Sequence, residues 1–196
     1  MSHPIPFTLP SNSAVLIGGG RSIAPGSSAW VACQSFARAI TLAGHQVHVG
    51  CATGADQACV ASLPASQAIA SLRVFAAFAP GGSGSFGGSA VAAIQLAALQ
   101  GASVSWLAGG PLSVPLVARL MARSLAALAG CSAAVFFAPG VGSLKVARHA
   151  LQAGIPVLVA CAGMSAAPVL AVAPVAVSWL GQSFWLFAPP AQGALF

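Results

Sequence analysis

The stretch that decides the fold is Gly140-Val-Gly-Ser-Leu-Lys-Val-Ala-Arg-His-Ala-Leu-Gln-Ala-Gly-Ile-Pro-Val-Leu-Val159. It predicts a glycine loop, a helix and a buried strand, and the apolar run 133–138 before it predicts another buried strand. Main-chain N–H groups at the start of such a helix, together with the helix dipole, favour an anion. We expect Ser143 to cap the helix, while Lys145 and Arg148 add positive charge to its first turns. The stretch therefore predicts a phosphate-binding loop that contains no carboxylate.

Positive charge dominates the composition. The 196 residues include 7 Lys and Arg against a single acid, Asp56, which gives a formal charge of +6 and an isoelectric point near 9.9. With one acidic side chain, no more than one Lys or Arg can have its own acidic partner. The excess positive charge must therefore face water, an anion or a partner. Nucleic acids, nucleotides and acidic surfaces are the ligands that such a balance favours.

Charged residues are also scarce, at 4% of the chain where about 25% is usual. A homo-oligomer that buries much of its surface explains this scarcity, and so does residence in a membrane. Residues 151–196 carry no charge, but prolines and glycines interrupt them, so no run of about 20 apolar residues remains to form a spanning helix. We therefore expect a homo-oligomer and not a membrane protein.

Two further features indicate a cytoplasmic protein. Residues 1–10 contain no basic region followed by a hydrophobic helical stretch, as a secretory signal would. The five cysteines are odd in number and mostly lie inside apolar runs, which is typical of buried thiols in a reducing compartment.

Strands and helices alternate along the chain, and most of the strands are uniformly apolar. The predicted strands are 14–18, 46–50, 72–78, 102–107, 133–138, 156–160, 172–180 and 184–188, and the main helices are 28–43, 56–62, 89–100 and 114–129. This pattern predicts an α/β fold, a Rossmann-like, doubly wound, mostly parallel sheet with helices on both faces. We expect an N-terminal extension at 1–12, the main domain at 13–162, and apolar strands at 163–196 that complete the sheet or form an oligomer interface.

Four loops follow predicted strands and are rich in glycine or other small residues. They comprise residues 18–22, 51–56, 81–88 and 139–143. Because the carboxyl ends of parallel strands meet at one edge of a sheet, we expect all four loops at the same edge, where ligands bind in such folds.

The motifs in these loops resemble a known superfamily. Val15-Leu-Ile-Gly-Gly-Gly-Arg-Ser22 resembles the first strand and turn of the SLOG superfamily of Rossmann-like proteins, and Gly50-Cys-Ala-Thr-Gly-Ala-Asp56 resembles its second loop. Within the superfamily, Pro115-Leu-Val-Ala-Arg-Leu-Met-Ala-Arg-Ser-Leu-Ala-Ala-Leu128 followed by Gly142-Ser-Leu-Lys-Val-Ala147 is most similar to the DprA (Smf) DNA-processing family. The similarity covers about residues 14–162.

This resemblance implies binding of single-stranded DNA in a basic pocket and partnership with a recombinase. Other SLOG members bind nucleotide-derived ligands, and the LOG branch cleaves cytokinin nucleotides. Val146 and Ala147 stand near the position of the LOG glutamate, so phosphoribohydrolase activity is not expected. Val146 also replaces a DprA threonine, and Arg119 and Arg123 replace the Arg-Asn-Arg of that family in another spacing.

The candidate ligand-binding or phosphate-binding residues are Gly20, Arg21, Ser22, Gly54, Asp56, Gly140, Gly142, Ser143, Lys145 and Arg148. Arg21 either grips a phosphate with its planar fork of donors or pairs with Asp56. Asp56 caps its helix, pairs with an arginine or binds a ribose hydroxyl. Arg119 and Arg123 lie on a nucleic-acid path or on a solvated helix face.

Catalysis is hard to build around one carboxylate, because a nucleophile and its base need a third, orienting group. The histidines and cysteines show no metal-binding spacing. We therefore expect no enzyme, no cofactor and no metal. The leading hypothesis is a non-catalytic protein that holds single-stranded DNA phosphates in a basic glycine-loop pocket. The alternatives are a sensor of a small nucleotide-derived ligand that acts through oligomerisation, and a structural assembly protein.

Overall fold

The computed structural model describes residues 4–63, 67–85 and 88–189. Within these residues, nine strands form one sheet in the order β1-β8-β9-β7-β6-β2-β3-β4-β5. The strands are β1 (Ile5–Pro6), β2 (Ala14–Gly19), β3 (Gln46–Val49), β4 (Leu72–Phe75), β5 (Ser103–Ser105), β6 (Ala133–Phe137), β7 (Val157–Ala160), β8 (Val175–Trp179) and β9 (Gln182–Phe187). The helices are α1 (Ser28–Leu42), α2 (Ala55–Ser62), α3 (Gln67–Ala70), α4 (Gly88–Leu99), α5 (Leu116–Leu128) and α6 (Val141–Gln152).

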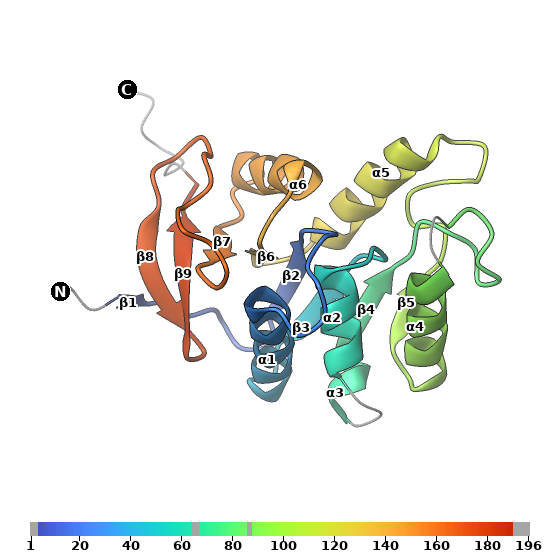
Figure 1. Ribbon diagram of the computed structural model, residues 1–196, viewed down its shortest axis with the longest axis horizontal. Coiled ribbons are helices and arrows are strands. Elements are labelled where there is room, and N and C mark those ends of the chain that lie inside the picture. Colours follow the sequence, from blue (N-terminus) through green and yellow to red (C-terminus); the bar gives the residue numbers. More distant parts are fainter. Residues whose placement is uncertain (1–3, 64–66, 86–87, 190–196) are drawn as a thin grey trace.

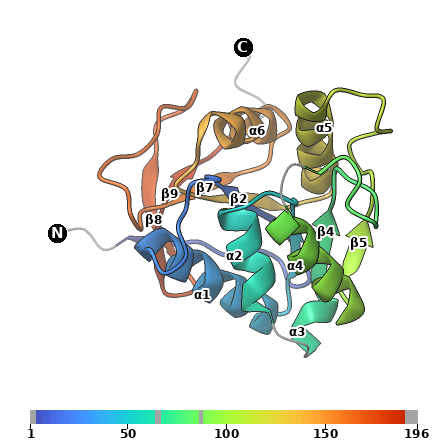
Figure 2. The ribbon, with the colours of Figure 1, turned by 45° about the vertical axis from the view of Figure 1, so that its right-hand side comes forward.

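The sheet is mostly parallel and is covered on both faces. Strands β2 to β7 pair in parallel, whereas β9 runs antiparallel to both β7 and β8. Helices α5 and α6 lie over one face, and α1, α2 and α4 lie over the other (Figures 1 and 2). The predicted doubly wound α/β fold is therefore confirmed.

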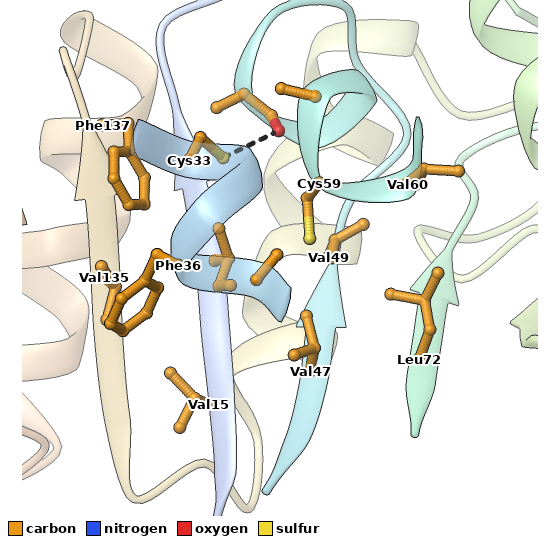
Figure 3. Packing of buried hydrophobic residues seen from close by; sticks show 14 of the residues in the cluster. Val15, Cys33, Phe36, Val47, Val49, Cys59, Val60, Leu72, Val135 and Phe137 are labelled. Atoms are coloured by element: carbon orange, nitrogen blue, oxygen red, sulfur yellow. Dashed lines mark hydrogen bonds between the residues drawn. The ribbon is translucent and has the colours of Figure 1, made fainter. Parts of the chain in front are cut away.

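Strand β2 shows how the sequence fills both layers. Successive side chains of a strand point to opposite faces. Val15 and Ile17 accordingly join the cluster beneath α1 and α2, while Leu16 joins the cluster beneath α5 and α6. Figure 3 shows Phe36 of α1 beside Phe137 of β6 in the first cluster, with their ring centres 5.9 Å apart. Complete burial of a side chain such as Phe36 contributes about 2–3 kcal/mol.

Both segments that flank residues 13–162 contribute strands to this same sheet. Hairpin β8–β9 extends the sheet beyond β7, and β1 pairs in parallel with β8. The apolar character of the C-terminal strands is explained in part by Phe184 and Phe187, which are fully buried.

Several predicted boundaries differ from the structure by one to three residues, and two of them have clear local reasons. The strand predicted over 72–78 ends at Phe75, because its partner β5 gives way to a turn after Ser105. The N–H of Ala76 donates to the carbonyl of Ser105, and the carbonyl of Ala76 accepts from the N–H of Ala108 in that turn, both at 2.9 Å. The helix predicted from 114 begins at Leu116, because Pro115 takes the N-cap position with an extended ψ of 139°.

Among the helices of the described ranges, none has both the length and the apolar character that crossing a membrane requires.

Candidate functional site

Glycine loops from β2, β3 and β6 meet at the carboxyl edge of the sheet and are held together by hydrogen bonds. The N–H of Gly20 donates to the carbonyl of Phe137 at 3.1 Å, and the N–H of Ala55 donates to the carbonyl of Gly20 at 3.2 Å. The hydroxyl of Thr53 donates to the carbonyl of Arg21 at 3.3 Å. The prediction that these loops share one edge is therefore confirmed for the three that come together here.

Two glycines permit this close approach. A Cβ atom on Gly19 would lie 2.1 Å from the carbonyl oxygen of Phe137. Gly54 has a φ of +75°, and a Cβ there would lie 2.1 Å from the carbonyl oxygen of Gly20. Gly54 is thus required by its backbone conformation and by the contact with the first loop.

Helix α6 begins at this junction without a side-chain cap. Gly140 is the N-cap residue, and the first helical hydrogen bond runs from the N–H of Leu144 to its carbonyl at 3.0 Å. The N–H groups of residues 141–143 consequently have no acceptor within the helix. A Cβ on Gly140 or Gly142 would meet no atom within 4 Å. Open space, unpaired helical donors and the helix dipole together make this terminus suited to an anion.

Ser143 does not cap α6 as predicted. It lies within the first turn, and its hydroxyl donates to the carbonyl of Gly19 at 2.6 Å. This bond ties the start of α6 to the end of β2. It joins residues 124 positions apart, so no local pattern in the sequence indicates it.

Positive side chains surround the junction. Arg21 and Ser22 are exposed on the first loop, and Lys145 and Arg148 are exposed on α6. Arg148 lies seven residues after Val141, or about 10 Å along the helix axis, so it belongs to the rim and not to the helix terminus. Of the seven Lys and Arg residues, two are buried and the other five are exposed, while the single acid is buried.

That acid, Asp56, is 6% exposed and is bonded within the protein. Its Oδ2 accepts from the N–H of Ala52 at 3.0 Å and from Nη2 of Arg123 at 3.3 Å. The sequence named Arg21 as the arginine partner of Asp56, whereas the ion pair of the structure is with Arg123. Helix α2 has no side-chain cap, so the predicted capping by Asp56 is wrong. The buried carboxylate holds the loop after β3 in place through Ala52. The geometry therefore does not support the interpretation that Asp56 binds a ribose hydroxyl.

Arg119 and Arg123 are buried, at 4% and 7% exposure, and the prediction that they follow a solvated helix face or a surface path is wrong. Arg119 donates to the carbonyls of Val114, Ala77 and Gly84. Arg119 and Arg123 point into the interior because their hydrogen-bond acceptors, those carbonyls and Asp56, lie there. The bond to Gly84 fixes part of the fourth predicted loop, of which residues 86 and 87 lie outside the described ranges.

The buried thiols are unsuited to nucleophilic chemistry. Burial raises the pKa of Cys33, Cys51 and Cys59, and it raises the pKa of Cys131 to about 12. Thiols with such pKa values stay protonated at neutral pH and react slowly. Within the residues that the structure describes, no three His, Cys, Asp or Glu side chains group closely enough to hold a metal.

His48 makes the stability of the fold depend on pH. Burial lowers its pKa below the ordinary 6.5, and the charge of Arg73 lowers it further, against the hydrogen bond to Ala127 that raises it. The unfolded chain takes up a proton as the pH falls through 6.5 and the folded chain does not, so stability is full above 6.5 and declines below it. Urea unfolding at pH 8 and pH 5.5 should show this decline.

His48→Gln should reduce the loss of stability between the two pH values. It should not abolish the loss, because burial also lowers the pKa of His45. An unchanged loss in the variant would mean that His48 does not titrate in this way.

The architecture and its edge loops define an α/β protein with a Rossmann-like sheet. The fold is similar to that of DNA processing protein A from Helicobacter pylori, with a TM-score of 0.58 and 18% sequence identity over 76% of this chain. The match spans 65% of the Helicobacter pylori chain, a protein that binds single-stranded DNA. The DprA-like fold predicted from the loop motifs is thereby supported. No protein-family model and no curated protein matches this sequence.

Proposed function

We propose that this protein is a non-catalytic nucleic-acid-binding protein that holds phosphates of single-stranded DNA at the N-terminus of α6. The observation that carries the proposal is the open start of that helix, where Gly140 and Gly142 have no packing reason to be glycine. A helical glycine costs about 1 kcal/mol relative to alanine. Packing does not explain why residue 142 is glycine, whereas close approach of a ligand to the helix backbone does.

The electrostatics support a chain of phosphates as the ligand. Arg21 lies on the loop that is hydrogen-bonded to β6 and α2, and Lys145 lies one turn into α6. The described surface carries no acidic side chain, so a polyanion meets no repulsion along it. Main-chain N–H groups and cations contact phosphates without reading bases, so little sequence preference is expected.

The likeness to DNA processing protein A adds support, because that protein, whose fold is similar, binds single-stranded DNA. A role in DNA processing or recombination, with a recombinase partner, belongs to the same proposal through the DprA resemblance. Membership of the SLOG superfamily and assembly into a homo-oligomer are proposed with it.

The test is fluorescence anisotropy of a labelled oligo-dT titrated with the protein at several salt concentrations. Contact with about three phosphates should give a slope near −2 for the logarithm of the affinity against the logarithm of the salt concentration. Lys145→Ala and Arg21→Ala should each reduce that slope by about 0.7. Arg73→Ala removes an exposed charge on β4, away from the glycine loops, and is the matched control.

Gly142→Ala distinguishes a ligand-binding helix terminus from a helix terminus that is only solvated. The new methyl group should stabilise α6 by up to about 1 kcal/mol, and it should weaken oligo-dT binding about tenfold, or about 1.4 kcal/mol, without changing the charge. Affinity that is unchanged by Gly142→Ala and by both charge variants would place any binding elsewhere.

Two alternatives remain open to the same measurements. A sensor of a nucleotide-derived ligand would bind a mononucleotide saturably, with little dependence on salt and with a change in oligomer size. A structural assembly protein would bind neither probe and would be large by light scattering. Exposed apolar side chains favour some assembly, since Leu99 is 86% exposed and Val117 is 80% exposed.

A further inference from the structure

Helix α4 is apolar on every side, yet it lies at the outer end of its helical layer. Of its 12 residues, only Ser89 and Gln95 have polar side chains. The helix packs against α2 and contacts β5, and it is the last helix of the layer that α1 and α2 also form (Figures 1 and 2). A helix that is apolar all round normally lies in an interior, so the outer side of α4 is suited to being covered.

The outer side of α4 carries a regular stripe of small and apolar residues. Ser89, Ala92, Leu96 and Leu99 are all exposed and follow one another at intervals of three, four and three residues. Leu96 is 55% exposed and Leu99 is 86% exposed. This spacing places the four side chains, which we call the α4 stripe, along one side of the helix, as in the seam between two packed helices.

The order of sizes within the α4 stripe makes it complementary to itself in one orientation. Its small residues lie in the N-terminal half of the helix and its two leucines in the C-terminal half. In an antiparallel pair with a twofold axis beside Ile94, Ser89 faces Leu99 of the second copy, and Ala92 faces Leu96 of the second copy. Each large side chain then meets a small one, as well-packed facing positions require. A parallel pair would set leucine against leucine and leave gaps between the small residues. Self-complementarity of this kind characterises a twofold interface between identical chains.

The distribution of charge also favours a second copy as the occupant. No Lys, Arg, Asp or Glu occurs between Arg73 and Arg119. Arg119 is buried, and Arg73 points to the opposite face of the sheet, because Leu72 and Val74 on either side of it join the cluster that includes Ile94. Two copies, each with a formal charge of +6, repel one another wherever exposed cations approach. Within the described surface, which carries no acid, they can meet without this repulsion at the uncharged α4 stripe. An acidic protein would be drawn to the cationic loops instead.

We propose that α4 packs antiparallel against α4 of a second copy, with the α4 stripe as the contact of a homodimer. The inference rests on the proposed assembly into a homo-oligomer, for which it supplies the interface, and it does not depend on the proposed DNA site. One helix of 12 residues per copy gives an interface at the small end of the range, below roughly 1,200 Å². A reversible dimer with a dissociation constant of about 1 μM is therefore expected.

Sedimentation equilibrium of the full chain tests the proposal. At about 10 μM, roughly tenfold above the expected dissociation constant, the mass of the wild type should approach twice 19.1 kDa. Leu99→Arg sets a charge against Ser89 of the second copy with no acid to pair with it, and should raise the dissociation constant about 100-fold or more. Leu42→Arg is the matched control and should leave the dimer intact. Leu42 and Leu99 are each the last residue of a helix and are 84% and 86% exposed, and an arginine at a helix C-terminus is favourable.

Two variants without added charge test the antiparallel arrangement. Leu96→Ala would leave a gap against Ala92 of the second copy and should raise the dissociation constant about tenfold. The exchange variant Ala92→Leu with Leu96→Ala again sets a large side chain against a small one. Because it conserves the volume of the contact, its dissociation constant should return to within about threefold of the wild-type value.

Three results would overturn the proposal. A wild type that is monomeric at about 100 μM would exclude both the interface and the proposed assembly. Equal effects of Leu99→Arg and Leu42→Arg on dimerisation would leave the assembly standing but exclude this interface. An exchange variant no better than Leu96→Ala would exclude the antiparallel contact. Anisotropy with labelled oligo-dT on the same variants reports on the DNA site alone, so failure of one proposal is distinguished from failure of the other.

Discussion

Asp56→Asn is expected to lower the free energy of unfolding by about 3 kcal/mol or more, because it leaves Arg123 as a buried charge without a counter-ion. Asparagine keeps the shape of the side chain and an oxygen for the N–H of Ala52, so the change isolates the charge. Nε of Arg123 already lacks a hydrogen-bond partner, and Nη1 is packed so tightly that a Cβ on Gly50 would lie 1.2 Å from it. Urea unfolding of both proteins at pH 7 gives the difference.

The double variant Asp56→Leu with Arg123→Met is the control for this prediction. Replacing both partners of a buried ion pair by apolar side chains is often neutral or stabilising, so the double variant should be more stable than Asp56→Asn. A loss below about 1 kcal/mol in Asp56→Asn would be in the range of an exposed ion pair and would contradict the buried role of Asp56.

Gly19→Ala is the second change with a large expected effect. Its methyl group would lie 2.1 Å from the carbonyl oxygen of Phe137, on backbone that cannot move without separating β2 from β6. Overpacking of this kind costs typically 1–3 kcal/mol and sometimes more, and we expect the upper end. The loss is measured by urea unfolding, as for Asp56.

Gly18→Ala, one residue earlier in the same strand, is the matched control. Its methyl group would lie 3.4 Å from the side chain of Phe136, which is ordinary contact distance. We expect a change of less than about 1 kcal/mol there. Equal losses in both variants would mean that the general cost of altering this strand, and not contact with the β6 backbone, explains the effect.

The fold and the edge that carries the candidate site were predictable because the signals are local. Uniformly apolar strands such as 133–138 are typical of parallel sheets covered on both faces. Loops that follow parallel strands must meet at one edge, whatever their detailed sequence. The Arg21 and Ser22 loop, the Gly54 loop and the start of α6 accordingly meet in the structure.

The roles of the buried polar residues were not predictable, because each depends on a distant partner. Arg123 and Asp56 are 67 positions apart, and Arg119 contacts a loop carbonyl 42 positions away. An arginine that recurs every four residues on a helix normally indicates an exposed face. In α5 the arginines face inward while Val117 faces out, because the interior supplies their acceptors and the surface supplies no acid.

A depression lined by residues 6–9, His45 and residues 178–181 had no signal in the sequence for a similar reason. Phe7, His45 and Trp179 come from three separate parts of the chain, and the antiparallel hairpin β8–β9 brings the last of them into place. Alternation of strands and helices does not predict where such a hairpin attaches to a sheet.

Burial of the single acid also determines how the protein behaves toward electrolytes. The exposed charged side chains are arginines and a lysine, with no acid among them in the described part of the chain. Small anions of the buffer gather around this positive charge as a counter-ion layer. At the proposed anion site, the start of α6, phosphate or sulfate in the medium would compete with the oligonucleotide, whereas chloride or acetate at low concentration would compete less. Two laboratories that work at the same pH and ionic strength, but with different buffer anions, should therefore measure different affinities for the same oligonucleotide.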